Sequence, residues 1–208
     1  MDKKTSSLLS WSLANSGNAN EDSNASQTQT DRPLKIDQET LRSLMGGPSD
    51  ADLMKQSMSA IVSEDVPLEQ KIIAFDNFEQ LVEQLDNANN IQPLGLWPAL
   101  KSQLSSSEQD LRRMSAWCIG TAVQNNEKSQ QHALQQGVIE PIAKMCIEEN
   151  DVATRRKACY ALSSLVRNCQ PNMDEASRYL PSNITGPDAV NANDMDVLDA
   201  IMSKLREQ

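Results

Sequence analysis

Residues 110–126 read DLRRMSAWCIGTAVQNN, and residues 153–169 read ATRRKACYALSSLVRNC. The second stretch repeats the first after 43 residues. The matching pairs are Arg112/Arg155, Arg113/Arg156, Trp117/Tyr160, Ile119/Leu162, Val123/Val166 and Asn125/Asn168. A repeat of about 40–47 residues with helical spacing is typical of HEAT and armadillo arrays. The stretch therefore predicts a helical solenoid, in which each unit packs only against its neighbours.

The same repeat extends to both sides of this stretch. LGLWPALKSQL (94–104) aligns with GVIEPIAKMCI (137–147) at a spacing of 43, and Ala74-Phe75 aligns with Ala116-Trp117 at 42. Gly137 should divide two shorter helices ahead of the RRKACY helix, which makes three helices per unit. Armadillo repeats have three helices and HEAT repeats have two. We therefore expect an all-α, armadillo-type right-handed superhelical solenoid of about two to three repeats, with helical caps and a disordered N-terminal segment.

The chain divides into four parts by composition and helical pattern. These are a flexible N-terminal segment with a short apolar motif (1–33), N-terminal capping helices (34–66), armadillo repeats (67–170), and a C-terminal linker with a capping helix (171–208). The first part is rich in Ser, Asn and Gln and has little to bury, so it cannot offset the entropy of ordering. Ser49 and Asp52 have the spacing of a capping box, and Asp194 can cap the last helix.

The composition excludes several classes of function. The formal net charge is −10, whereas nucleic acids and anionic membranes need a basic surface. No signal peptide or membrane-spanning run is evident, which favours a cytoplasmic protein, and we expect a monomer. The four cysteines show no metal-ligand or secreted-domain spacing, so they are expected to be reduced, packed thiols.

No catalytic or cofactor-binding set stands out. The single histidine, His132, lies in a Gln-rich helix, and we expect it to be a solvated surface residue. The glycine-rich motifs that hold phosphates are missing from the sequence. The sequence therefore predicts a binding protein that is not an enzyme and carries neither a cofactor nor a metal.

A solenoid of three-helix units offers a long surface made by the third helix of each unit. Arginine and asparagine recur on these helices, and both give directional hydrogen bonds. Arg112 and Arg155 can instead link one repeat to the next, and the asparagines can serve as turns or caps. Ala88 is expected to face solvent between amides, which leaves room for close approach. The predicted partner-binding residues are Asp86, Asn87, Ala88, Asn89, Asn90, Arg113, Asn125, Asn126, Arg156 and Asn168.

Longer blocks of sequence carry a family resemblance. They are LLSWSLANS (8–16), GGPSDADLMKQSM (46–58), AFDNFEQLVEQLDNANNI (74–91), GLWPAL (95–100), WCIGTAVQNNEKSQ (117–130), YALSSLVRN (160–168) and, more weakly, DMDVLDAIMSKLRE (194–207). Together these blocks resemble the fungal Fes-type proteins. Those are relatives of the mammalian heat-shock-protein-binding factors, which are nucleotide exchange factors for 70-kDa heat-shock chaperones.

The resemblance implies a co-chaperone function. The armadillo array would hold one lobe of the chaperone's ATPase domain, displace the other lobe and open the cleft that holds ADP, in support of protein folding and translation. It also implies that a mobile N-terminal segment mimics chaperone substrate. Here that segment would be the apolar motif of Leu8, Leu9, Trp11 and Leu13. Better-known relatives have about four repeats, so this shorter array departs from their pattern.

A different armadillo class is the alternative. Armadillo adaptors that bind basic peptides, or other protein partners, repeat a Trp-x-x-x-Asn pair on their inner helices. Trp117 is followed four residues on by Thr121, and Tyr160 by Ser164, so the pair does not occur here.

Overall fold

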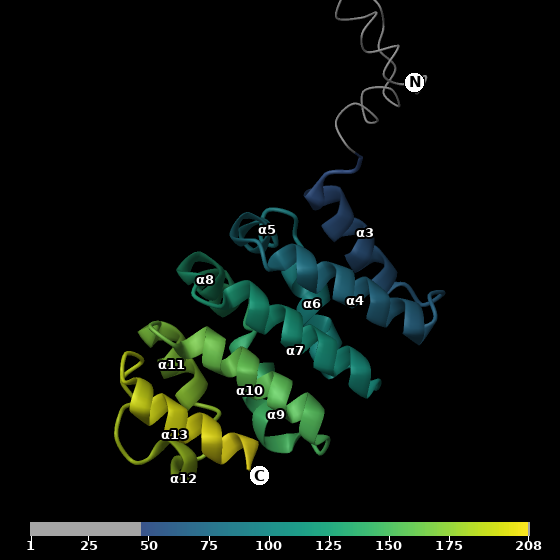
Figure 1. Cartoon of the computed structure of the whole chain (residues 1–208). Helices are drawn as coiled ribbons and strands as arrows, with labels where there is room; N and C mark the ends of the chain where they lie inside the picture. Colours follow the sequence, from purple (N-terminus) through teal and green to yellow (C-terminus); the bar gives the residue numbers. More distant parts are fainter. Residues whose placement is uncertain (1–46, 208) are drawn as a thin grey trace, which may run out of the picture. The chain divides into compact units, whose positions relative to one another are not determined.

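The computed structural model describes residues 47–207, and every regular element in this range is a helix (Figure 1). The helices are α3 (Asp50–Val62), α4 (Leu68–Val82), α5 (Leu85–Asn90), α6 (Trp97–Ser102), α7 (Gln109–Val123), α8 (Glu127–Gln135), α9 (Ile139–Glu148), α10 (Val152–Val166), α11 (Gln170–Ser177), α12 (Ser182–Thr185) and α13 (Met195–Arg206), with a short 3-10 turn at Gln103–Ser105 after α6. The N-terminal segment 1–33, which we expected to be flexible, lies outside the described range.

The helices follow one another as three-helix units. The units are α5–α6–α7, α8–α9–α10 and α11–α12–α13. Helix α4, which precedes the first complete unit and takes the place of a third helix, packs side by side with the third helices in the order α4, α7, α10, α13 (Figure 1). The residues that precede these third helices, Glu108, Asp151 and Asp194, are spaced by 43 residues. This arrangement confirms the predicted all-α armadillo-type solenoid.

The helix ends obey the local rules that the sequence suggested. The Ser49 hydroxyl accepts a hydrogen bond from the Asp52 amide at 3.2 Å and starts α3 as a cap. Asn125 and Asn168 end α7 and α10 in the left-handed region, with φ of 52° and 56°. Asparagine is one of the few residues besides glycine that adopts this conformation at low cost. The chain can therefore turn sharply from each third helix into the next unit.

The stretch after Cys169 is more regular than we expected. We predicted a linker and one helix there, but the stretch also contains α11 and α12. Pro171 stands in the first turn of α11, where a missing N–H costs nothing, so it starts the helix and does not break it. Asn172 is fully buried and its Nδ2 donates to the carbonyls of Gln130 (3.2 Å) and Leu165 (2.9 Å), which fixes α11 against the preceding unit.

The core runs the length of the described chain and is aliphatic. Phe75, Phe78 and Trp97 are its buried aromatic residues, and leucine, isoleucine, valine, methionine, alanine and cysteine supply the rest. All four cysteines are buried and unpaired, as expected for packed thiols. Burial raises the pKa of the Cys118 thiol well above its ordinary value, so this cysteine stays protonated.

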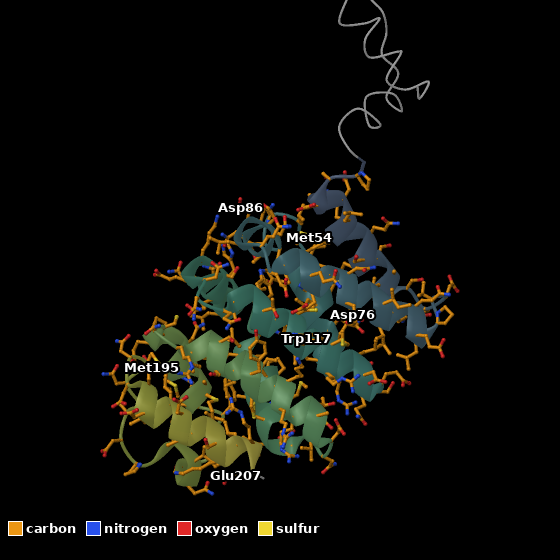
Figure 2. The ribbon with its side chains drawn as sticks, viewed as in Figure 1. Met54, Asp76, Asp86, Trp117, Met195 and Glu207 are labelled. Atoms are coloured by element: carbon orange, nitrogen blue, oxygen red, sulfur yellow. The ribbon has the colours of Figure 1, made fainter. Side chains whose placement is uncertain are left out.

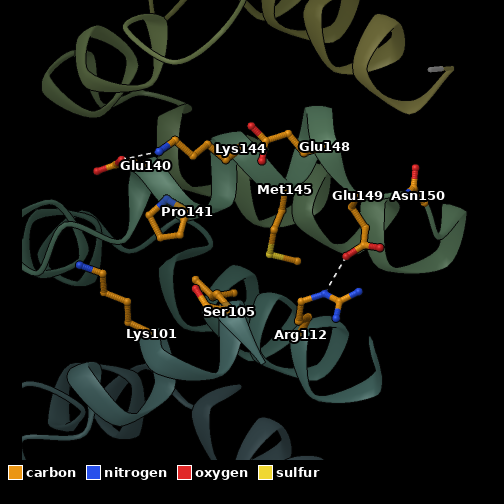
Figure 3. A pocket seen from close by; sticks show the side chains of 11 residues that line it. Lys101, Ser105, Arg112, Glu140, Pro141, Lys144, Met145, Glu148, Glu149 and Asn150 are labelled. Carbon is orange, nitrogen blue, oxygen red and sulfur yellow. Dashed lines mark hydrogen bonds and ion pairs between the residues drawn. The ribbon is translucent and has the colours of Figure 1, made fainter. Parts of the chain in front are cut away.

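Two arginines of adjacent third helices meet on one glutamate. Arg112 Nε donates to Glu149 Oε2 at 2.8 Å (Figure 3). Arg155 Nη1 donates to the Glu149 carbonyl at 2.9 Å. Arg155 is only 8% exposed. Arg112 therefore links its repeat to the next, which was one of the two roles considered for it, whereas Arg155 bonds within its own unit.

Helices α7 and α10 approach each other closely at Gly120 of α7. A Cβ atom at this position would lie 2.5 Å from Tyr160 Cε1 and 3.1 Å from Ala161 Cα, both on α10. A distance under 3 Å forces a displacement, and the backbone atom of Ala161 limits how far the helices can adapt. Glycine at position 120 therefore sets the spacing of α7 and α10.

We expect Gly120→Ala to destabilise the protein even though alanine is the better helix former. Helix propensity favours alanine by about 1 kcal/mol, whereas overpacking a core contact costs about 1–3 kcal/mol. Urea denaturation should therefore show a lower free energy of unfolding. Combining the change with Tyr160→Ser removes the ring and should recover part of the loss; a simple sum of the two single effects would contradict the proposed clash.

The ion pair between Arg112 and Glu149 should make the free energy of unfolding depend on pH. The guanidinium of Arg112 lowers the pKa of the Glu149 carboxyl below its usual value. A group whose pKa is lower in the folded chain stabilises it above the unfolded pKa, about 4.3 for glutamate, and loses this effect as pH falls through the folded pKa. Wild type should therefore be more stable than Glu149→Gln at neutral pH, and the difference should shrink on acidification. Urea denaturation of both proteins at about pH 7 and about pH 3 measures it; a difference independent of pH would contradict this cause.

Candidate functional site

The third helices together form one face of the described chain, which we call the third-helix face: the side chains of α4, α7, α10 and α13 that are not buried in the core. These four helices run next to one another, and Asp76 of α4 and Trp117 of α7 lie along the face in Figure 2. Helices α4, α7 and α10 each have 15 residues. Each of them buries one side in the core and leaves another side accessible.

Trp117 and Tyr160 form an aromatic pair across α7 and α10. Neither ring is fully buried, although Trp117 packs against the hydrophobic core. The ring of Tyr160 lies over Gly120, where no side chain competes for space. Its hydroxyl donates to Gln124 Oε1 at 3.0 Å, which fixes the ring along α7. Both aromatic residues are therefore held in place before any partner arrives.

A lysine lies on this aromatic pair. Lys157 Nζ is 3.6 Å from the centroid of the Trp117 ring and 5.9 Å from that of Tyr160. A cation over an aromatic face is attracted by the ring's quadrupole, most strongly for tryptophan. Burial lowers the pKa of the Lys157 ammonium, and the nearby charge of Arg113 lowers it further, while Glu79 raises it. Lys157, Trp117 and Arg113 are therefore close neighbours on the third-helix face.

Acidic groups border this cluster on the α4 side. Glu79 is buried, and its Oε1 accepts a hydrogen bond of 2.7 Å from the Thr121 hydroxyl of α7. On α7 itself, Asp110 Oδ1 pairs with Arg113 Nη2 at 2.7 Å. Glu79 is thereby committed to joining α4 with α7, and Asp110 is committed to Arg113.

The predicted partner-binding residues fall into two groups. Several are accessible: Asp86, Asn125, Arg156 and Asn168 are exposed, and Asn89, Asn90 and Arg113 are half-buried. Of these, only Arg113 and Arg156 lie on the third helices, because residues 86–90 belong to the separate helix α5 and the two asparagines end α7 and α10. We had expected residues 86–90 to lie in the same layer as the third helices.

Three predicted residues lie in the interior. Asn87 and Asn126 are each 5% exposed and Ala88 is 2% exposed, so the expectation that Ala88 faces solvent is wrong. Asn87 Nδ2 donates to Asp50 Oδ2 (2.8 Å) and to the Leu81 carbonyl (3.0 Å). Asn126 caps α8 by accepting from the Ser129 amide. These amides hold helix ends together, because a buried amide must find partners inside the protein.

The apolar motif of Leu8, Leu9, Trp11 and Leu13 lies outside the described residues, so its role as a substrate mimic stays a prediction. Trp117, Tyr160 and Lys157, by contrast, were not among the predicted site residues. The repeat pairs Trp117 with Tyr160 in the sequence, and two partly accessible aromatic residues in a chain with 3% aromatics could have drawn attention to them. The position of Lys157 over Trp117 has no comparable signal, because it depends on how two helices pack.

The described residues offer little for catalysis. Among residues 47–207, no group of three or more His, Cys, Asp or Glu side chains is placed to hold a metal ion. His132 is half-buried, not solvated, and no partner for its Nδ1 is found in this range. None of the described helices has the length and apolar character needed to cross a membrane.

One cleft, between the second helices, is already occupied by its own ion pairs. Figure 3 shows this hollow of about 520 Å³ next to α9, with Arg112 reaching Glu149 and Lys144 reaching Glu140. Lys101, at its other end, donates to the Gln136 carbonyl at 3.0 Å. The cleft is therefore a polar seam between repeats, with two of its carboxylates held in ion pairs.

Comparison with known proteins supports the fold and gives the family. An engineered protein of known crystal structure superposes with a TM-score of 0.57 at 14% identity, covering 81% of this chain and 71% of its own, which supports the fold alone. The sequence matches the family described as nucleotide exchange factor Fes1 over residues 5–91 and the SIL1/FES1/HPBP1 C-terminal domain over residues 87–175.

Several relatives are similar over their whole length. The Hsp70 nucleotide exchange factor FES1 of Coccidioides immitis (strain RS) is 47% identical over 100% of this chain and 99% of its own. The FES1 protein of Gibberella zeae is 46% identical over 100% and 97%, and that of Neurospora crassa 40% identical over 100% and 98%. Identity at this level over complete chains, on an armadillo-type fold, leads to one conclusion: this chain belongs to the Fes1 family of Hsp70 nucleotide exchange factors.

Proposed function

We propose that the protein is a co-chaperone that binds the ATPase domain of a cytosolic 70-kDa heat-shock chaperone and accelerates release of ADP, in support of protein folding and translation. The observation that carries this proposal is the similarity to exchange factors along the whole chain. The third-helix face supports it, because a continuous face of fixed side chains is what a binding protein without catalytic groups requires.

The size of the third-helix face suits a specific complex. A helix of 15 residues is about 22 Å long, and packed helices lie about 8–10 Å apart. From α4 to α13 the face therefore measures roughly 22 Å by 30 Å, or about 660 Å² before side chains are counted. A standard interface buries about 800 Å² on each partner. The face formed by α4, α7, α10 and α13 therefore lies within the lower part of the range for specific interfaces, about 600–1,000 Å² per partner.

Exchange by such a protein is a coupling between two ligands of the chaperone. The factor can loosen ADP only if it binds the open ATPase domain more tightly than the closed, ADP-bound one. Typical couplings of about 1–3 kcal/mol change affinity about 5–150-fold, and ADP must weaken binding of the factor by the same ratio. Such an activity needs no nucleotide contact by the factor itself. We propose that it acts as a monomer.

The adaptor alternative has less support. An adaptor for basic peptides would present amide side chains next to its aromatic residues on the third-helix face. Ser164, four residues after Tyr160, is only 8% exposed, and Thr121, four residues after Trp117, donates to Glu79. The positions that would carry the peptide-binding amides are therefore committed to packing.

The first prediction from this function concerns the rate of nucleotide release. A fluorescent ADP analogue bound to the chaperone ATPase domain should dissociate about 5–150-fold faster when the protein is added at saturation. The same coupling requires that added ADP weaken the complex of the two proteins in a titration. An unchanged release rate at saturating protein would remove the exchange function.

The second prediction locates the contact. Trp117→Ala removes the central aromatic residue of the third-helix face, and hot spots of interfaces are enriched in tryptophan. Binding to the ATPase domain should weaken by about tenfold or more, with helicity preserved by circular dichroism. Lys144→Gln is the control, since Lys144 is exposed on α9 and lines the seam of Figure 3. A larger loss for Lys144→Gln than for Trp117→Ala would place the interface on the second helices.

A further inference from the structure

Positive charge gathers on the third-helix face of a chain whose net charge is −10. Arg113 comes from α7, and Arg156 and Lys157 are neighbours on α10. Within residues 47–207, Arg113 is paired with Asp110, but neither Arg156 nor Lys157 forms an ion pair. Three cations, two of them without an ion pair in the described range, therefore lie on neighbouring helices of this part of the face.

The geometry holds these cations ready for a ligand. Lys157 is fixed over Trp117 at 3.6 Å, so little side-chain entropy remains to be lost on binding. The carboxylate that most influences it, Glu79, is buried and bonded to Thr121, and forms no ion pair with Lys157. Arg156 precedes Tyr160 by four residues, which places both side chains on the same side of α10. Positively charged side chains and aromatic rings therefore lie next to each other on this face.

We propose that Trp117, Tyr160, Lys157 and Arg156, which we call the cationic anchor, bind an aspartate or glutamate side chain presented by the chaperone ATPase domain. This inference rests on the proposed function and adds the chemistry of the contact. The carboxylate takes the charge of Lys157 and Arg156, and the aromatic rings cover the stem of the same side chain. Arginine and aromatic residues in one partly desolvated patch are the usual composition of an interface hot spot.

The surrounding negative charge gives the anchor a role in orientation. An acidic patch on the partner is repelled by the net negative charge of this chain and attracted at the anchor. Complementary charge of this kind raises the association rate and selects the register of docking. The anchor therefore fixes which part of the ATPase domain meets the centre of the third-helix face.

Charge reversal outside the core tests the anchor. Arg156 is exposed and its side chain forms no hydrogen bond or ion pair within residues 47–207, so Arg156→Glu should leave the fold unaffected. Lys128→Glu is the matched control, because Lys128 is exposed on α8, away from the third helices, and the change in charge is identical. Association rates with the nucleotide-free ATPase domain should be measured by stopped-flow fluorescence at about 0.05 M and about 0.5 M salt, since screening strengthens over this range.

We expect Arg156→Glu to slow association on the order of tenfold at low salt and much less at high salt. Lys128→Glu should change the rate by less than about twofold. Lys157→Met keeps an unbranched apolar side chain on Trp117 and removes the charge. It should weaken the complex on the order of tenfold, mainly through faster dissociation.

Other outcomes overturn the inference. Equal slowing by Arg156→Glu and Lys128→Glu would mean that only net charge matters, and faster association of Arg156→Glu would mean that the partner surface is basic. Either result contradicts the cationic anchor while leaving exchange activity intact. Failure of the wild-type protein to bind the ATPase domain or to release the ADP analogue would instead overturn the proposed function itself.

Discussion

The close approach of α7 and α10 at Gly120 is the constraint on which the rest of the site depends. With no Cβ at this position, the Tyr160 ring can lie flat on α7 and reach Gln124 with its hydroxyl. Lys157, three residues earlier on α10, then comes within 3.6 Å of the Trp117 ring. A single hydrogen in place of a side chain thus decides both the spacing of two repeats and the arrangement of aromatic and charged groups on their shared face. The packing of α7 against α10 therefore also determines which side chains this face presents.

Arginines one residue apart in the repeat have opposite roles. Arg112 and Arg155 turn toward the seam and share Glu149, whereas Arg113 and Arg156 remain accessible on the third helices. Successive helical residues differ by about 100° in direction, so an Arg-Arg pair necessarily serves two surfaces. The linkage is not repeated at the next seam: the residue 43 positions after Glu149 is Ala192, and within the described chain no partner is found for Arg155 Nε. The ion pair between an arginine of one unit and a glutamate of the next is therefore formed by Arg112 and not by Arg155.

Sequence reasoning succeeded where structure is decided locally. The spacing of 43 residues, Gly137 between α8 and α9, and the caps at Ser49 and Asp194 each follow from backbone rules that involve a few neighbouring residues. It failed where packing against a helix distant in the sequence determines the burial or the contacts of a residue. Ala88 looks like a solvent-facing residue between amides, but α5 packs against α7 and α8 and buries it. The contact of Lys157 with Trp117 joins residues 40 positions apart, and only the packing of α7 against α10 shows it.

In the proposed function, a third-helix face held in a fixed arrangement would explain how the protein favours nucleotide release. A ligand that binds two states of its partner equally well shifts nothing, however tightly it binds. If the face binds the chaperone as proposed, a compliant face would adapt to both states of that partner alike and would lose this difference in affinity. Buried amides such as Asn172, the shared Glu149 and the Gly120 contact oppose such adaptation, because each must break or distort before the helices can move. The same contacts that stabilise the fold therefore preserve the preference for one conformation of the partner.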